Sequence, residues 1–467
     1  MIARNPATVT PPTEFAPDEL EPEASPSEAE SISGANRVAR EEPEPAAADA
    51  AKTPTTKKPT TLYRVVWRWH FYAGLIVSPV MLVTALTGAI YTFQHELSQW
   101  IYADLYFVEP AGEPLSYERQ WEVAAEALGE GLELEGFQPS PDPTQSTVFA
   151  AHLHEGGEGH GQEHRMIYLN PYDGEVLGTM IQEREFFAVV LQIHRSLFAG
   201  TTGRIVVELC TSWGLLLLFT GTYLWWPRKK PNKGVWKPKI RGKKYRVLRD
   251  LHAVSGFYLL GVATIVLGTG LFFTFGWGTA YHLTSMAAGQ SLMPIFSPRD
   301  AAEVPEGEAS ASLDDVVSAV FSAADVNYED RVLMRKGEPG QQYQAFIMRN
   351  ADHYTMRVAF ADPHTAETEV IGVSDFPPMA HAFPLAISLH QGKTFGLPSQ
   401  IAAFVACLGI MGLIVSGAWM WWVRRPRGKS GFPAPNNPGS IPRWLLAMIV
   451  GFGLFLPTVG VSLLLIL

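Results

Sequence analysis

Five stretches of this chain run for more than 20 positions with almost no charge, and no other feature of the sequence restricts the fold so strongly. A helix needs about 20 apolar residues to cross the ~30 Å hydrocarbon core of a bilayer. The windows are Phe71–Phe93, Ile205–Trp226, Ala253–Phe275, Ile401–Val423 and Trp444–Leu467. Only the second contains a charged residue, Glu208. The sequence therefore predicts a multi-pass membrane protein with five spans.

The basic residues predict the orientation. Segment 227–249 carries 11 Lys/Arg and no acid, and "RRPRGK" at 424–429 is also basic. Short basic loops favour the cytoplasmic side. We therefore expect a cytoplasmic N-terminus, extracytoplasmic segments at 94–203 and 276–400, and an extracytoplasmic C-terminus.

Residues 1–58 differ in composition from the rest of the chain. They are rich in Pro, Ala and Glu and poor in large apolar residues, which predicts a disordered cytoplasmic tail. The net charge of −10 comes partly from this tail and does not indicate a nucleic-acid partner. The two cysteines, Cys210 and Cys407, lie in different spans, so no disulfide framework is expected.

The chain repeats itself. "HFYAGL…TGAIYTF" begins at His70 and "HAVSGF…TGLFFTF" at His252, with a glycine four residues later and Thr-Gly 17 residues later in both. His194 and His390 begin a second matching pair, in which Trp-Trp follows 31 residues later. This self-similarity predicts two units of the same architecture plus a fifth helix.

Each unit also contains a soluble segment. "SYERQWEVAAEAL" and "SLDDVVSAVFSAA" predict short helices, and turn-forming residues within 166–178 and 356–372 predict hairpins. The predicted fold class is membrane α+β: a duplicated four-helix core, a fifth C-terminal helix and two extracytoplasmic α+β domains. The predicted boundaries are tail 1–58, helix 62–95, domain 96–183, histidine segment and helix 184–226, loop 227–250, helix 251–277, domain 278–380, histidine segment and helix 381–423, loop 424–442 and helix 443–467.

Symmetry predicts how the histidines are placed. Repeats that enter the membrane in the same direction are related by a pseudo-two-fold axis along the membrane normal. His70 and His252 are then expected to face each other at the cytoplasmic level, and His194 and His390 at the extracytoplasmic level. Opposed imidazoles in an apolar bundle suit axial ligation of haem iron, so two bis-histidine b-type haems are predicted.

Other residues are expected to support such haems. Arg68, Arg195 and Arg249 lie beside the histidines and are candidates for pairing with propionates. Six glycines are candidates for making room for the macrocycle: Gly74, Gly88, Gly221, Gly256, Gly270 and Gly417. Each feature also has a simpler explanation: histidines at helix ends lie at the interface, glycines permit close packing, and arginines orient helices.

The remaining histidines form two groups. His95 and His282 follow the first and third spans and are reserve ligands. A Gly-rich loop carries His152, His154, His160 and His164. Such tracts bind divalent metals in some proteins, but this one has no counterpart in the second unit, so a solvated insertion is the competing interpretation.

The quoted stretches, together with "WRWHFYAGL", "LQIHRSLFAG", "LRDLHAVSGFY", "SLHQG" and the two hairpins, resemble the PepSY-associated transmembrane family over about residues 60–426. The resemblance implies PepSY-like extracytoplasmic domains and haem ligation by the four paired histidines. It also implies a bacterial inner-membrane reductase that acts on ferric siderophores and releases Fe(II) in the periplasm.

The expected activity needs an electron donor. The sequence has no P-loop, no HExxH and no GxGxxG after a strand, so the donor is expected to be a cytoplasmic reductase or the quinol pool. Membrane lipid and a ferric siderophore or periplasmic iron-binding partner are the other expected partners. The alternatives are a non-enzymatic PepSY-domain interaction protein and a metal-ion transporter, although acidic ligands are nearly absent from the spans.

Overall fold

The computed structural model describes residues 62–128, 132–153, 164–227, 235–302, 310–433 and 443–466. The expected disordered tail lies outside these residues, as do His154, His160 and part of the basic loop. The described residues form a bundle of long helices and one antiparallel sheet, joined by shorter helices.

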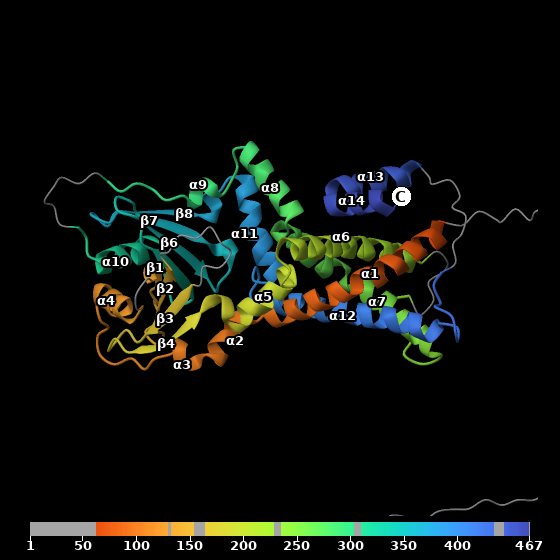
Figure 1. Ribbon diagram of the computed structural model, residues 1–467, viewed down its shortest axis with the longest axis horizontal. Coiled ribbons are helices and arrows are strands. Elements are labelled where there is room, and N and C mark those ends of the chain that lie inside the picture. The colour runs from red at the N-terminus through yellow and green to blue at the C-terminus, as the bar shows by residue number, and fades with distance from the viewer. Residues whose placement is uncertain are drawn as a thin grey trace, which may run out of the picture. The chain divides into compact units, whose positions relative to one another are not determined.

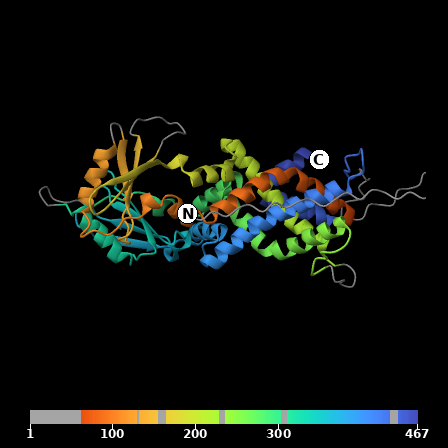
Figure 2. The same cartoon turned by 90° about the horizontal axis from the view of Figure 1, so that it is seen from below.

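Four long helices form the bundle: α1 (Leu62–Tyr91), α6 (Gly200–Trp225), α7 (Lys244–Gly270) and α12 (Leu397–Arg424). Each is long and apolar enough to cross a membrane, which confirms the first four predicted windows as helices. α1 and α7 each pack against both α6 and α12, so α1 and α7 lie diagonally opposite each other. Both views show α1 (red to orange) beside α12 (blue) (Figures 1 and 2).

Small residues let these helices approach closely. Ala263 is fully buried, and a Cβ atom on Gly214 would lie 3.2 Å from Met81 and 3.4 Å from Leu267. Packing of this kind supplies much of the attraction between helices in lipid, where apolar burial alone gives little. The two cysteines are buried in the bundle as free thiols.

Each half of the chain contributes a helix and four strands to the sheet. The first half gives α4 (Tyr117–Leu128), β1 (Leu132–Gln138), β2 (Thr147–Leu153), β3 (Arg165–Leu169) and β4 (Val176–Ile181). The second gives α10 (Leu313–Ala323), β5 (Asp330–Arg335), β6 (Tyr343–Arg349), β7 (Arg357–Ala361) and β8 (Thr368–Gly372). The strand order is β4-β3-β2-β1-β5-β6-β7-β8, and every neighbouring pair is antiparallel.

The prediction of two separate domains is corrected by the seam between β1 and β5. Gly136 pairs with Arg335 and Phe137 with Met334, and a Cβ atom on Gly136 would overlap the Met334 carbonyl. One apolar core spans the seam, with Phe137 and Phe149 from the first half and Met334 from the second all buried. An unpaired strand edge exposes backbone N–H and C=O groups that can pair with another chain, and joining the two β-meanders covers one such edge of each.

Shorter helices connect the sheet to the bundle. They are α2 (Gln94–Ile101), α3 (Ala103–Tyr106) and α5 (Phe186–Ser196) in the first half, and α8 (Gly276–Ala287), α9 (Met293–Phe296) and α11 (Pro378–Gln391) in the second. Single turns of 3-10 helix lie at Gln182–Arg184, Leu271–Phe273, His353–Thr355 and Val373–Asp375. Buried Glu208 accepts hydrogen bonds from the backbone N–H groups of Gly276 (2.6 Å) and Trp277 (3.1 Å), which fixes the start of α8 on α6.

The predicted fifth span is not one helix. Its residues form α13 (Arg443–Phe455) and α14 (Pro457–Ile466), of 13 and 10 residues. At 1.5 Å per residue these are about 20 and 15 Å long, which is too short to cross a bilayer. Pro457 breaks the helix, and α14 folds back so that Gly460 touches Gly453. α13 and α14 contact each other, α14 packs against α6, and Phe452 of α13 reaches the Phe219 ring of α6 (Figure 1).

Candidate functional site

Two pairs of histidines face each other in the bundle. His70 on α1 and His252 on α7 have ring centres 6.4 Å apart and perpendicular ring planes. His194 on α5 and His390 on α11 have ring centres 6.1 Å apart, with an interplanar angle of 57°. The structure thus brings together both pairs that the repeat predicts.

Backbone carbonyls fix the tautomer of three of these rings. The Nδ1 atom of His252 donates to the carbonyl of Leu413 at 3.0 Å. His194 Nδ1 donates to the carbonyl of Thr84 at 3.0 Å, and His390 Nδ1 donates to the carbonyl of Val266 at 2.9 Å. Because a carbonyl oxygen can only accept, Nδ1 carries the proton and Nε2 keeps its lone pair in the neutral ring. Among the described residues, none of these Nε2 atoms has a hydrogen-bond partner.

The fourth ring reaches the same state through a hydroxyl. His70 Nδ1 lies 2.9 Å from Thr220 Oγ1, and that hydroxyl donates its own proton to the Leu216 carbonyl at 2.8 Å. The hydroxyl therefore accepts from Nδ1, which leaves Nε2 unprotonated here as well. Histidines that bind metals show this arrangement, in which one nitrogen donates to a fixed acceptor and the other is free to coordinate.

A glycine on a neighbouring helix faces each ring. A Cβ atom added to Gly221 would lie 3.2 Å from His70 Cε1, and one added to Gly417 would lie 3.4 Å from His252 Cε1. A Cβ atom added to Gly88 would lie 3.2 Å from His194 Cε1, and one added to Gly270 would lie 2.9 Å from His390 Cε1. These four glycines make room for the imidazoles themselves. The two other predicted glycines, Gly74 and Gly256, face leucine side chains.

The spacing and donor set of each pair fit one metal ion between two rings. Bonds of about 2 Å from the metal to each nitrogen, plus about 1 Å from each nitrogen to its ring centre, place the ring centres about 6 Å apart. Within the described residues, no three His, Cys, Asp or Glu side chains cluster closely enough to hold a metal ion. A metal held by either pair must therefore bring its other ligands with it.

The three predicted arginines differ in their surroundings. The Nε atom of Arg68 is buried and has no hydrogen-bond partner among the described residues, so an anionic group that reached it would satisfy it. Arg249 instead forms a 2.6 Å ion pair with buried Asp250, which accounts for its charge without a propionate. Arg195 is exposed at the end of α5.

Neither reserve histidine joins a pair. His95 lies on α2, where burial and the positive charges of Arg331 and Lys393 lower its pKa to about 4. His282 lines a mostly apolar cavity of about 330 Å³ together with Tyr281 and Phe383. Among the described residues, neither ring stacks on or hydrogen-bonds to a member of the two facing pairs.

The His-rich loop shows no assembled metal site among the described residues. His164 Nδ1 is 2.6 Å from Glu183 Oε1, while His152 Nδ1 is 4.0 Å from Glu135 Oε2. These two histidines therefore lie against different carboxylates. His154 and His160 belong to the residues outside the description.

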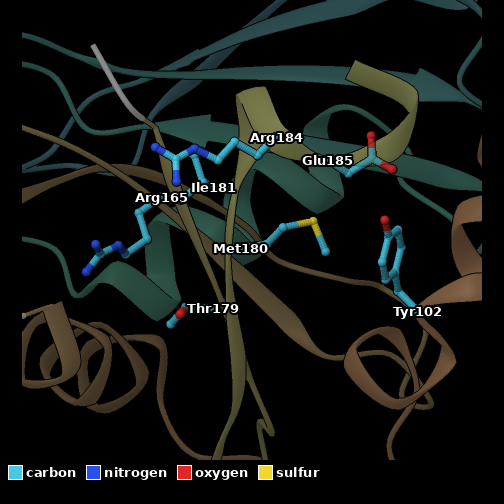
Figure 3. Close-up of a pocket in the computed structure, with 7 residues that line it drawn as sticks. All are labelled: Tyr102, Arg165, Thr179, Met180, Ile181, Arg184 and Glu185. Carbon is cyan, nitrogen blue, oxygen red and sulfur yellow. The ribbon is translucent and has the colours of Figure 1, made fainter. Parts of the chain in front are cut away.

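A second cavity, of about 490 Å³, opens at the edge strand β4. Its lining residues are Tyr102, Arg165, Thr179, Met180, Ile181, Arg184 and Glu185. Figure 3 shows the guanidinium groups of Arg165 and Arg184 on one side and Glu185 facing Tyr102 on the other. Glu185 is also the N-cap of α5, where it accepts from the Ala188 N–H at 2.9 Å, and His194 is nine residues further along the chain. No motif in the sequence indicates this cavity, because its residues come from three separate parts of the chain, at 102, 165 and 179–185.

The sequence contained one further unused signal. Thr220-Gly221, Ser416-Gly417 and Thr87-Gly88 each place a hydroxyl within 3.2 Å of a histidine Nδ1, with the ring-facing glycine next in sequence. Thr269-Gly270 completes the series in sequence, although there the carbonyl of Val266 is the partner of His390. A hydroxyl residue followed by glycine therefore marks each imidazole.

Four helices able to cross a bilayer, with paired histidines between them and a joined antiparallel sheet, define an integral membrane protein with an attached α+β region. The chain belongs to the PepSY-associated TM region family, which matches residues 67–424. This confirms the resemblance seen in the sequence. No curated protein matches the chain.

Proposed function

We propose that this protein is a dihaem electron-transfer protein of the bacterial inner membrane that reduces ferric chelates, such as ferric siderophores, on the side of the sheet. The observation that carries the proposal is the set of four imidazoles that face each other in pairs, each with Nδ1 engaged and Nε2 available. In this proposal the two units arose by duplication, which explains why both pairs follow the same pseudo-symmetry.

Haem would supply one-electron chemistry between Fe(III) and Fe(II) when bound at each pair. His70 and His252 would hold one group and His194 and His390 the other. The chain orients the four Nε2 atoms through its carbonyls and Thr220, and its apolar helices exclude water from the rings. We call His70 and His252 the inner pair. Arg68, which is half-buried with its Nε atom unpaired among the described residues, offers a cation for the propionates of a haem at this pair.

The two levels suit transfer across a membrane. His70 and Gly88, which contacts His194, are 18 residues apart on α1. At 1.5 Å per residue the levels are about 27 Å apart along the helix axis, close to the thickness of the hydrocarbon core. We infer that the end of the bundle with the basic loops is cytoplasmic and that the sheet is periplasmic.

The cavity at β4 is the proposed docking site for the substrate. Its two guanidinium groups suit an anionic iron chelate. The cavity lies at the start of α5, so a chelate bound there would contact the N-terminus of the helix that carries His194. One electron converts Fe(III) to Fe(II), which hard oxygen ligands hold less tightly.

The test is the absorption spectrum of protein purified from haem-replete cells. We expect a Soret band, a sharp α band after dithionite, and about two haems per chain by pyridine haemochrome, as two bis-histidine sites require. His252→Ala and His390→Ala are each expected to remove about half the haem. His282→Ala is the matched control, because this histidine belongs to neither pair, and it is expected to retain both haems. A colourless wild-type protein would contradict the proposal.

A further inference from the structure

The loops at one end of the bundle form a strongly basic surface, which we call the basic end. Its exposed cations within 235–249 and 424–433 are Lys237, Lys239, Arg241, Lys243, Lys244, Arg246, Arg249, Arg424, Arg425, Arg427 and Lys429. These two segments contain no Asp or Glu. Within the described residues, only Arg249 among these cations forms an ion pair, with Asp250. The surface therefore carries a large uncompensated positive charge.

Hydrogen bonds hold both loops against the helices. Trp225 Nε1 donates to the Val235 carbonyl (3.0 Å) and Tyr258 Oη to the Trp236 carbonyl (3.2 Å). In the second half, Trp421 Nε1 donates to the Ser430 carbonyl (3.1 Å) and Tyr72 Oη to the Pro433 carbonyl (3.0 Å). Each loop is thus fixed by one indole and one phenol, so the cations stand on an ordered platform.

The platform lies over the inner histidine pair. The Arg424 guanidinium is 5.8 Å from the Trp67 ring on α1 and 5.6 Å from the Tyr245 ring on α7. α1 and α7 are the two diagonal helices that carry His70 and His252. Trp67 precedes His70 by three residues, about one helical turn. A cation between diagonal helices lies toward the bundle axis, whereas lipid headgroups surround the bundle at its periphery.

Exposed apolar side chains stand among the cations. Trp236, Ile240 and Phe432 are 47%, 73% and 48% exposed. Aromatic residues and arginine together are typical of protein–protein interfaces.

We propose that the basic end is the docking surface for a soluble one-electron carrier protein with an acidic face, which feeds the inner pair. The inference rests on the proposed function, which requires a donor on this side, and it deepens that function by naming the donor's chemistry. Each reduced carrier gives up one electron and leaves oxidised, and one Fe(III) on the opposite side becomes Fe(II). No covalent bond forms or breaks in the protein.

The test uses the full-length chain in nanodiscs of uncharged phosphatidylcholine and an acidic flavodoxin as the probe. We expect flavodoxin to bind at low salt and to bind about tenfold more weakly with Arg424→Glu and Arg427→Glu together, because rim charges set attraction between proteins. Arg424→Gln should show a smaller loss. Arg443→Glu is the matched control, because Arg443 has the same charge but starts the hairpin packed on α6. Basic cytochrome c should not bind.

The outcomes separate this inference from the function on which it rests. Binding is measured with haem-free as well as haem-loaded protein, so a chain that binds flavodoxin but no haem retains the docking surface and loses the reductase. The docking surface alone is overturned if flavodoxin does not bind and reduced flavodoxin does not reduce the haem, while dithionite does reduce it. The docking surface is also overturned if the arginine variants bind flavodoxin as the wild type does but bind vesicles containing anionic phosphatidylglycerol more weakly. That result would assign the cations to lipid binding.

Discussion

At the scale of single residues, the site consists of an imidazole, an acceptor for Nδ1 and a glycine facing the ring, repeated four times. The imidazoles were predictable because the repeat places them at matched positions. Their acceptors were not, because three are backbone carbonyls, which every residue carries. The role predicted for the glycines was too general, since four of them face a histidine ring and two face leucines.

Gly270→Ala tests this arrangement. The added Cβ atom would lie 2.9 Å from His390 Cε1, closer than carbon atoms pack, so the ring must move out of line with His194. We expect loss of about half the haem with the helix intact. Gly268→Ala is the control, because a Cβ atom there meets nothing within 4 Å. In a helix that change should be neutral or stabilising by about 0.5–1 kcal/mol.

Equal haem contents in the Gly270 and Gly268 variants would show that the ring position does not depend on the glycine. The midpoint of thermal unfolding, monitored by circular dichroism for both variants, distinguishes a local change at the ring from general destabilisation.

At the scale of elements, α4 and α10 cap each other across the two halves. The Tyr117 N–H at the start of α4 donates to both oxygens of Asp314 (3.1 and 3.0 Å), and the Leu313 N–H at the start of α10 donates to Glu118. Carboxylates favour helix N-termini, where unpaired N–H groups and the helix dipole are positive. The sequence predicted both helices but not this exchange, which depends on how the halves meet.

The carboxyl pair makes a prediction about pH. Burial and the hydrogen bond with Glu118 raise the pKa of Asp314 to about 6 from its usual 3.8. Burial acts to raise the pKa of Glu118, but hydrogen bonds from Asp314 and the Leu313 N–H outweigh it and lower that pKa. Folding therefore favours a proton on Asp314, and this contribution to stability is lost as the pH rises through about 6.

Asp314→Asn keeps a donor for Glu118 without the charge, so the midpoint of thermal unfolding should fall less between about pH 5 and pH 7 than in the wild type. The exposed Asp104→Asn is the control and should keep the wild-type slope. If Asp314→Asn and the wild type show the same slope, the shared proton does not contribute to stability.

At the scale of the whole molecule, two predictions needed correction, and both concern how segments are joined. Apolar windows predict spans from length and composition alone. They do not show that Pro457 divides the last window into two helices too short to cross a bilayer. Repeats identify two soluble segments but not that β1 and β5 pair at Gly136 to form one sheet. The cue for the seam is a single glycine within a strand, a signal too weak to interpret without the structure.

The hairpin of α13 and α14 leads us to expect the C-terminus on the cytoplasmic side, not on the extracytoplasmic side that five spans predict. Phe455 at the tip accepts from Trp277 Nε1 at the start of α8, whereas Ser462 accepts from Trp213, five residues beyond Glu208 on α6 toward the basic end. α14 therefore returns toward the end from which α13 begins. We expect a fluorescent protein fused after Leu467 to fluoresce in the cytoplasm and alkaline phosphatase fused there to be inactive.

Alkaline phosphatase inserted after Gln290, between α8 and α9, should be active and serves as the control. An active phosphatase at the C-terminus would restore the odd number of crossings that the apolar windows predict.

The shared sheet has a consequence for the paired histidines. Each member of a pair comes from a different half, and lateral drift of one half against the other would change the distance between them. A common core beneath β1 and β5 braces the halves outside the lipid. The polypeptide thus sets the gap between opposed imidazoles by itself, so the haem binding proposed above would order little additional chain and would cost little chain entropy.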